Sequence, residues 1–97
     1  MAKLSNKYGS SSFHNTTIRT TVNKLTSILG EAQCIDNSGD DKTNFDWSCE
    51  TEDGDVFTIY DWKEYRSISE DELIEFHIGG ENKSITDKAR RELLEML

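Results

Sequence analysis

Hydrophobic and polar residues alternate along three stretches of the chain, and each alternation predicts a β-strand with one buried face. In the first stretch Phe45, Trp47 and Cys49 fall on one side, and polar residues fall on the other. The dipeptide Asp53-Gly54 follows it, which is a strong signal for a tight hairpin. The predicted strands are Thr43–Glu50, Val56–Lys63 and Glu72–Ile78. Their order and short connections predict an antiparallel meander.

Two other stretches have apolar residues at helical spacing, which predicts amphipathic helices. The first helix is expected over Thr17–Leu29, with Asn15 or Thr16 as its cap and Gly30 as its end. The second is expected to begin at Ser84 and to run to the C-terminus, since Ser84 with Asp87 resembles a capping box. The predicted apolar positions are Ile18, Val22, Leu25, Ile28 and Leu29 in the first helix, and Ile85, Ala89, Leu93 and Met96 or Leu97 in the second.

These elements predict an α+β domain in which both helices cover one face of the sheet. The sheet is a three- to four-stranded antiparallel meander, and short additional strands are allowed near Lys3–Tyr8 and Ala32–Ile35. We expect one domain over residues 1–97, with 1–14 as a flexible or strand-forming N-terminal segment.

The composition limits the classes of function. The chain has 97 residues, of which 34% are hydrophobic and 31% charged, with a formal net charge of −8. Such an acidic domain repels phosphate backbones, which argues against direct nucleic-acid binding. The start of the chain has no apolar stretch, no segment is apolar enough to span a membrane, and Cys34 and Cys49 read as reduced thiols. We therefore expect a cytoplasmic protein with no membrane partner.

No catalytic motif supports an enzyme: nucleophile elbow, HExxH and P-loop patterns are all missing from the sequence. Two groups of residues could carry chemistry, but each also has an ordinary structural explanation. A zinc set of Cys34, Cys49, His14 and His77 lacks ligand spacing, and an Asp46–Asp61 acid pair on neighbouring strands reads equally as two solvated carboxylates. We expect neither catalytic residues nor a cofactor or metal.

The strand Val56–Lys63 has large side chains on both faces, so Tyr60 and Trp62 lie on the face that the helices leave open. They either pack on the N-terminal segment or form an interaction surface. The loops Gly9–Asn15 and Ile78–Ser84 are rich in small residues and are each expected to lead into a helix. Such loops either cap helices or offer backbone N–H groups to an anion. Together these features favour a pocket for a small anionic, ring-bearing molecule such as a nucleotide.

Three segments resemble a family of small phage proteins, and that family resembles the phage anti-Thoeris sponges. The segments are Ser12–Ala32, Lys42–Lys63 and Phe76–Gly80, and their most specific parts read IYDWK and HIGG. The chain departs from the family pattern at Ala32, where proline is usual, and at Phe76, where tryptophan is usual. The resemblance implies a counter-defence protein that binds and sequesters a cyclic ADP-ribose-type immune signal without degrading it, and that assembles as an oligomer.

The resemblance also implies roles for single residues. Tyr60 and Trp62 shape the binding surface, Asp61 and Lys63 orient the ligand, and three arginines contact its phosphates. With the residues of the two small-residue loops, the candidate ligand-binding set is Ser11, Ser12, Phe13, Tyr60, Asp61, Trp62, Lys63, Arg66, His77, Gly79, Gly80, Arg90 and Arg91.

Two further hypotheses stay open at the level of the sequence. The protein either blocks a basic groove on a host defence nuclease, as an acidic anti-CRISPR or nucleic-acid mimic, or it is a small phage protein with no ligand. A continuous acidic stripe would favour the mimic, and aromatic residues gathered with the glycine loops would favour the sponge. The apolar C-terminal sequence LLEML and the surplus of aromatic positions on the sheet predict a homo-oligomer.

Overall fold

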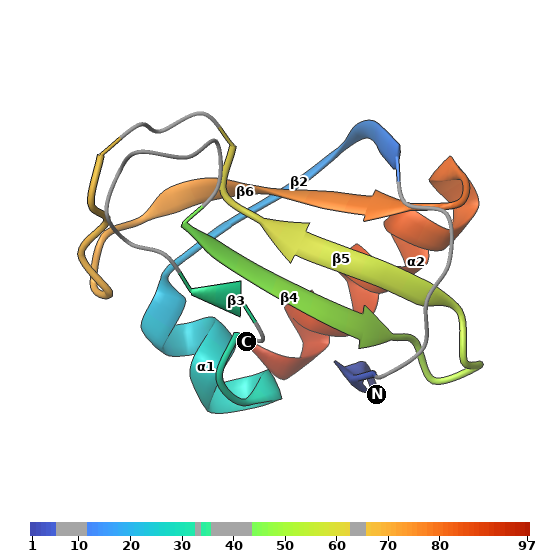
Figure 1. Cartoon of the computed structure of the whole chain (residues 1–97). Helices are drawn as coiled ribbons and strands as arrows, with labels where there is room; N and C mark the ends of the chain where they lie inside the picture. The colour runs from blue at the N-terminus through green and yellow to red at the C-terminus, as the bar shows by residue number, and fades with distance from the viewer. Residues whose placement is uncertain (6–11, 33, 36–43, 63–65) are drawn as a thin grey trace.

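The computed structural model describes residues 1–5, 12–32, 34–35, 44–62 and 66–97. They form an antiparallel sheet with two helices packed on one of its faces (Figure 1). This confirms the predicted α+β class. The elements in chain order are β1 (Lys3–Leu4), β2 (Ser12–Thr20), α1 (Val22–Leu29), β3 (Cys34–Ile35), β4 (Phe45–Glu50), β5 (Val56–Tyr60), β6 (Ile74–Gly80) and α2 (Lys83–Met96).

The sheet has six strands in the order β1-β4-β5-β6-β2, and β3 pairs with β4 beside β1. The predicted meander is its centre, since β4, β5 and β6 pair in sequence. The hairpin turn between β4 and β5 is at the expected place: Gly54 has φ of 88°, a conformation that favours glycine. The Gly54 N–H donates to the Thr51 carbonyl at 2.9 Å.

One hydrophobic core lies between the sheet and the helices. The alternating residues of the three predicted strands fill it, and α2 contributes the predicted face around Ala89 and Leu93. Side chains with no exposed surface include Leu25, Trp47, Phe57, Ile59, Phe76, Ile78 and Leu93. The alternation in the sequence therefore identified the inner face of the sheet correctly.

The first predicted helix was wrong in its first half. Thr17–Thr20 belongs to β2, which pairs with β6, and α1 begins only at Val22 with the Thr21 hydroxyl as its cap. Apolar residues at positions 18 and 22 are four apart, and this spacing fits a strand as well as a helix. The β-branched run Thr16–Ile18 and the threonines after it favour the strand. Of the predicted loop Gly9–Asn15, residues 12–15 are themselves part of β2, and residues 9–11 lie outside the described part of the chain.

Two smaller boundaries also differ from the prediction. The helix α2 begins at Lys83, one residue before the expected start, and its cap is Asn82 and not Ser84. The strand β6 continues through Gly79 and Gly80 instead of ending before them, because both glycines pair with neighbouring strands. Both allowed extra strands are present, as β1 and β3.

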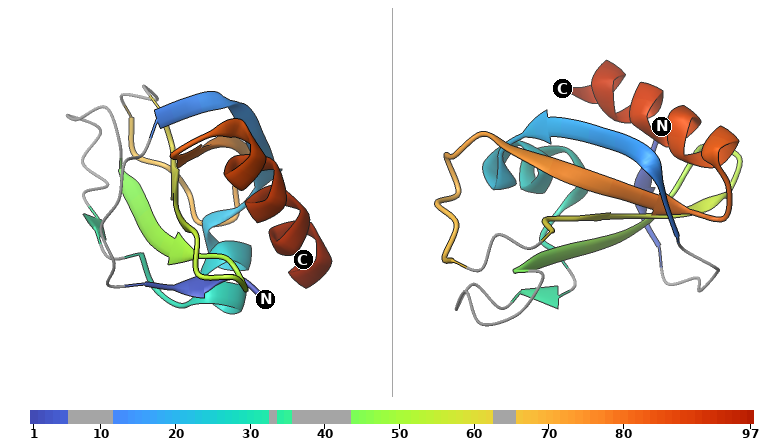
Figure 2. Two further views of the ribbon diagram at one scale, coloured as in Figure 1. Left: turned by 90° about the vertical axis from the view of Figure 1, so that its right-hand side faces the viewer. Right: turned by 90° about the horizontal axis from the view of Figure 1, so that it is seen from above.

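Both helices lie behind the sheet in Figure 1, and the two turned views in Figure 2 place them on the same side. The other face of the sheet, called the open face below, carries no described helix. Within the described ranges, no helix is both long enough and apolar enough to cross a membrane.

Candidate functional site

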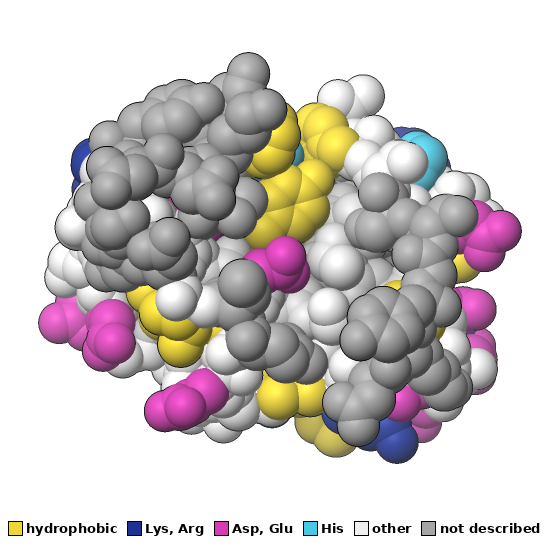
Figure 3. Space-filling view, viewed as in Figure 1, with side chains coloured by type: hydrophobic (Ala, Val, Ile, Leu, Met, Phe, Trp, Pro, Cys, Tyr) yellow, Lys and Arg dark blue, Asp and Glu magenta, His cyan; other side chains and the backbone are white. Residues whose placement is uncertain are grey.

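Four aromatic side chains gather on the open face, and they are called the aromatic cluster below. Phe13 stacks on His77 with ring centroids 4.0 Å apart and planes 12° apart. Tyr60 meets His77 edge-on at 5.5 Å, and Trp62 stacks on His77 at 6.2 Å. Figure 3 shows this gathering as an apolar patch on the open face. The imidazole of His77 is thus the centre of a small platform of rings.

The pairing of three strands positions these rings. Tyr60 on β5 lies opposite His77 on β6, and Phe13 on β2 lies opposite Gly79. Because side chains alternate along a strand, Tyr60 and His77 point to the face opposite to Ile59 and Ile78. Phe13 and Trp62 are about 40% exposed, at 41% and 40%. The cluster therefore has ring surface available for a ligand.

A bulge in β2 brings Phe13 onto the cluster. The pairing between β2 and β6 shifts between Phe13 and Thr17, and Asn15 there adopts φ of 63°. The His14 Nε2–H donates to the Gly80 carbonyl at 3.1 Å, which fixes the bulged segment to the end of β6. Phe13 thus meets aromatic residues that lie far from it in the sequence.

Burial keeps the central ring of the cluster neutral. Desolvation lowers the pKa of His77 below 6.5, and the negative charge of Glu75 opposes this only in part. Desolvation likewise raises the pKa of Tyr60, with a smaller contribution from Asp46. At pH 7 the platform is therefore made of uncharged rings, which suits stacking on a heterocycle.

Asp46 borders the cluster, because it lies opposite Tyr60 on β4. Its Oδ1 atom is buried, and no hydrogen-bond donor among the described residues reaches it. Desolvation raises the pKa of Asp46 above 3.8, and the nearby charge of Asp61 raises it further. The sequence alone treated Asp46 only as half of an acid pair and did not place it in the ligand site.

The raised pKa gives a stability prediction with a definite sign. Since Asp46 binds its proton more tightly in the folded state, its stabilising contribution is present below pH 3.8 and is lost as the pH rises through the folded pKa. Asp46→Asn should therefore raise the free energy of unfolding at pH 7 and have little effect below pH 3.8. Thermal unfolding of both proteins across this pH range measures the difference.

Asp53→Asn is the matched control with the opposite sign. Asp53 pairs with Lys88 at the hairpin, and the hydrogen bond from Lys88 lowers the pKa of Asp53. Its stabilising contribution is present above the unfolded pKa and is lost at lower pH. Asp53→Asn should slightly lower stability at pH 7. Equal shifts in both variants would contradict the assignment of Asp46 as a strained carboxylate.

The prediction that Asp61 orients the ligand needs correction. Asp61 has no exposed surface, and its carboxylate accepts the Asn44 N–H at 2.8 and 3.0 Å and the Phe45 N–H at 2.8 Å. The side chain therefore holds the start of β4, and it does not point to the open face. The same geometry rules it out as a solvent-facing partner of Asp46 in an acid pair.

The three predicted arginines do not join the cluster either. Arg66 is exposed, and its guanidinium donates to both carboxylate oxygens of Glu72. Arg66 therefore already has an anionic partner in the place of a ligand phosphate. Arg90 and Arg91 lie on α2, which packs on the other face of the sheet, and Arg90 Nε donates to the Thr17 carbonyl at 2.9 Å. A cation that sequence reasoning missed does lie on β2: exposed Arg19 pairs in register with Glu75. It was missed because the segment was assigned to a helix.

The glycines of the predicted phosphate loop have different roles. Gly79 lies within β6 beside Phe13 and Thr58, on the open face. Gly80 lies over α2, where an added Cβ would come within 2.9 Å of Thr86 Cγ2. Ser12 pairs with Gly80 at the edge of the sheet. Ser11 and Lys63 lie outside the described residues.

Two members of the candidate zinc set, Cys49 and His77, lie on opposite faces of the sheet. Cys49 faces the core, whereas His77 faces the opposite side of the sheet, and burial raises the pKa of the Cys49 thiol to about 12. Within the described part of the chain, no three His, Cys, Asp or Glu residues are placed to hold a metal ion.

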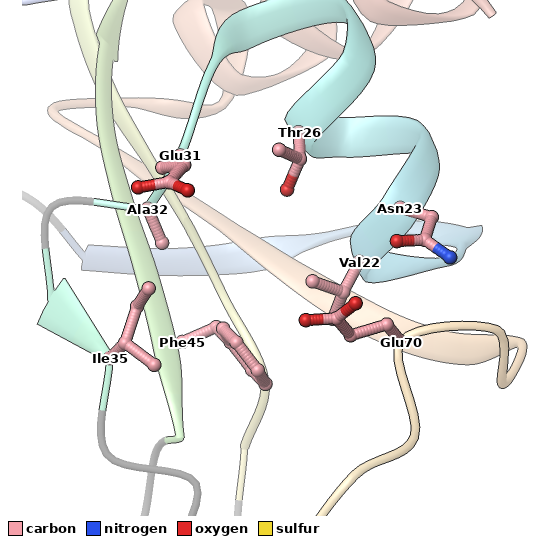
Figure 4. A pocket seen from close by; sticks show the side chains of 8 residues that line it. All are labelled: Val22, Asn23, Thr26, Glu31, Ala32, Ile35, Phe45 and Glu70. Atoms are coloured by element: carbon pink, nitrogen blue, oxygen red, sulfur yellow. The ribbon is translucent and has the colours of Figure 1, made fainter.

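A separate hollow of about 180 Å³ lies between α1, β3 and the start of β4 (Figure 4). Val22, Ala32 and Phe45 contribute apolar surface, and Glu31 and Glu70 contribute carboxylates. Two negative charges disfavour an anionic ligand at this place. None of the candidate residues from the sequence lines this hollow, so the aromatic cluster remains the candidate site.

Comparison of the chain with protein-family models, with curated proteins and with solved structures finds no match.

Proposed function

We propose that this protein binds a small nucleotide-derived signalling molecule on the aromatic cluster and sequesters it without turnover. The observation that carries the proposal is the platform of neutral rings formed by Phe13, Tyr60, Trp62 and His77. Aromatic faces stack on any nucleobase, and each stacked base contributes about 1–3 kcal/mol. With the resemblance to phage sponges, this supports a counter-defence role in an infected bacterial cell.

The charges around the cluster support an anionic ligand with a fixed direction. Arg19 on β2 is the cation that we assign to the phosphate, in place of Arg66, Arg90 and Arg91. Asp46 on β4 lies on the other side of the cluster and repels a phosphate. In this proposal the rings hold the base, and no residue is assigned to hydrolysis of the ligand.

The position of the acidic residues does not favour the alternative of a nucleic-acid mimic. Glu52, Asp53 and Asp55 lie at the β4–β5 turn, and Glu70 to Glu72 lie in the connection at the other end of β5. Several are paired with cations, as Asp53 is with Lys88 and Glu72 with Arg66. These two groups of acids lie at opposite ends of β5, and Asp40 and Asp41, which the predicted stripe included, lie outside the described residues.

Calorimetry against cyclic ADP-ribose isomers and cyclic oligonucleotides tests the proposal. We expect binding of at least one of them, and heat denaturation of the complex should release the ligand chemically intact. Degraded ligand would indicate an enzyme. No binding of any panel member, together with tight binding to a defence nuclease complex, would replace the proposal with the acidic mimic.

Trp62→Ala should weaken the binding of a panel ligand about 5- to 150-fold, which corresponds to the loss of one stacked base. The fold should persist because Trp62 is 40% exposed. Leu94→Ala is the matched control, since Leu94 is a similarly exposed apolar side chain on α2. An affinity that falls equally in both variants would count against a site on the open face.

The predicted homo-oligomer stays a prediction. Leu94 and Leu97 near the C-terminus are exposed at 46% and 42%, and Met96 between them is half-buried. These residues lie on the helical side, so self-association through them would leave the aromatic cluster accessible.

A further inference from the structure

The carboxylate of Asp46 lies in register with the rings of the cluster, on the side of β4. Asp46 lies directly opposite Tyr60, and Tyr60 in turn lies opposite His77. The three residues form one row across β4, β5 and β6 on the open face. Directly opposed side chains on neighbouring strands have Cβ atoms about 5 Å apart, so Asp46 lies within reach of the edge of a ring stacked beside Tyr60.

The Oδ1 atom of Asp46 lacks the partner that a buried carboxylate oxygen normally has. It is buried, and no donor of the described residues reaches it. Leaving such an acceptor unsatisfied is costly, and more so for a charged group. Its surroundings do not relieve the charge: Asp61 is negative, and Cys49 on the same strand points to the core. Asp46 as a residue is only half-buried, so an N–H donor of a ligand on the open face can approach the carboxylate and offset part of this cost.

We propose that Asp46 accepts a hydrogen bond from an N–H group on the edge of the ring that the aromatic cluster holds. The inference rests on the proposed function, and it names the class of base: one with an amino group on the edge remote from the sugar phosphate, as in adenine. A ring with only acceptors on that edge would leave the carboxylate without this hydrogen bond and would face a repulsive charge.

The strand order sets the direction of the ligand. Asp46 on β4 and Arg19 on β2 are separated by β5 and β6, so three strand spacings give about 14 Å between their strands. The amino edge of the base lies toward β4, and the sugar phosphate lies toward β2. A reversed ligand would place its phosphate beside Asp46.

A pair of probes that differ in a single amino group tests the inference. The probes are adenosine 3′,5′-cyclic monophosphate and purine riboside 3′,5′-cyclic monophosphate, which lacks the 6-amino group. We expect the wild-type protein to bind the amino compound about 10- to 100-fold more tightly, the discrimination typical of a hydrogen bond to a charged acceptor. NMR titration of isotope-labelled protein measures both affinities and shows whether the resonances of His77 and Tyr60 shift.

Asp46→Leu should remove the discrimination, so that both probes bind with similar affinity. Asp46→Asn keeps the shape of the side chain and a neutral acceptor oxygen, so it should retain a smaller preference for the amino compound. This variant replaces Asp46→Leu in the test if the leucine variant does not fold. Glu75→Leu is the matched control. It removes one negative charge beside His77 but leaves Asp46 in place, so the preference should persist.

The outcomes separate the two proposals. If the wild-type protein binds both probes equally, or if Asp46→Leu still prefers the amino compound, the role of Asp46 is overturned while the aromatic site stands. If neither probe binds but a member of the wider panel does, the assigned class of base is overturned. If no nucleotide binds at all, the proposed function fails, and the inference fails with it.

Discussion

Trp47→Ala is expected to lower the free energy of unfolding by about 3–5 kcal/mol, as large aromatic truncations in a core do. Trp47 has no exposed surface, stacks near Phe45 with centroids 6.0 Å apart and meets Phe76 edge-on at 5.8 Å. Its Nε1–H donates to the Gly30 carbonyl at 3.1 Å, which connects β4 to the end of α1. Since domains of this size have a total stability of about 5–15 kcal/mol, the variant should be close to unfolded at 37 °C.

Chemical denaturation followed by circular dichroism measures this effect, and the protein supplies its own control. Trp62→Ala is the same chemical change at a position that is 40% exposed, so it should lower the free energy of unfolding much less. It should instead abolish most binding of the proposed ligand. The two tryptophans thus separate folding from binding. Similar losses of stability in both variants would show that the core is not centred on Trp47.

Asp61→Ala is expected to lower the free energy of unfolding by about 2–6 kcal/mol, because it leaves two buried N–H groups unsatisfied at about 1–3 kcal/mol each. These are the N–H groups of Asn44 and Phe45, at the start of β4. Asn44 in turn donates through Nδ2 to the Arg66 carbonyl at 2.8 Å, so the loss should also loosen the connection after β5. Urea denaturation at pH 7 gives the magnitude.

Two comparisons keep this prediction specific. Asp61→Asn retains one acceptor oxygen and should cost less than the alanine variant. Asp71→Ala removes an exposed carboxylate, bonded to Asn23, and should change stability by no more than about 0.5 kcal/mol. If Asp61→Ala is as mild as Asp71→Ala, the side chain of Asp61 belongs to the ligand surface, as the sequence had indicated.

Much of the fold could be predicted from alternation alone. The core side of β4, with Phe45, Trp47 and Cys49, follows from the period of two, and the Asp53-Gly54 turn fixes the pairing with β5. The strand β2 could not be separated from a helix, since Ile18 and Val22 satisfy both periods. Only its pairing with β6, far along the chain, decides between them.

The sequence selected the rings of the candidate site, but it did not place them together within one chain. Tyr60, Trp62, His77 and Phe13 lie together on the face that the helices leave open. Asp61 lies between Tyr60 and Trp62, so the alternation that exposes those two rings turns Asp61 toward the interior. The alternation of side chains along the strand was therefore enough to exclude Asp61 from the candidate ligand-binding set. The positions of Arg66 and Arg90 depend on local ion pairs and helix packing, which no short pattern in the sequence specifies.

The aromatic cluster joins segments that are far apart in the sequence, and this sets when the proposed site can form during synthesis. The bonds that hold β2 to the last third of the chain close very long loops, since His14 and Gly80 are 66 residues apart and Thr16 and Thr86 are 70 apart. Such contacts form slowly, and their entropic cost precedes their gain. A ribosome therefore has to release the chain through α2 before the proposed ligand could be captured. A nascent chain that stops before β6 would carry Tyr60 and Trp62 but would have no platform.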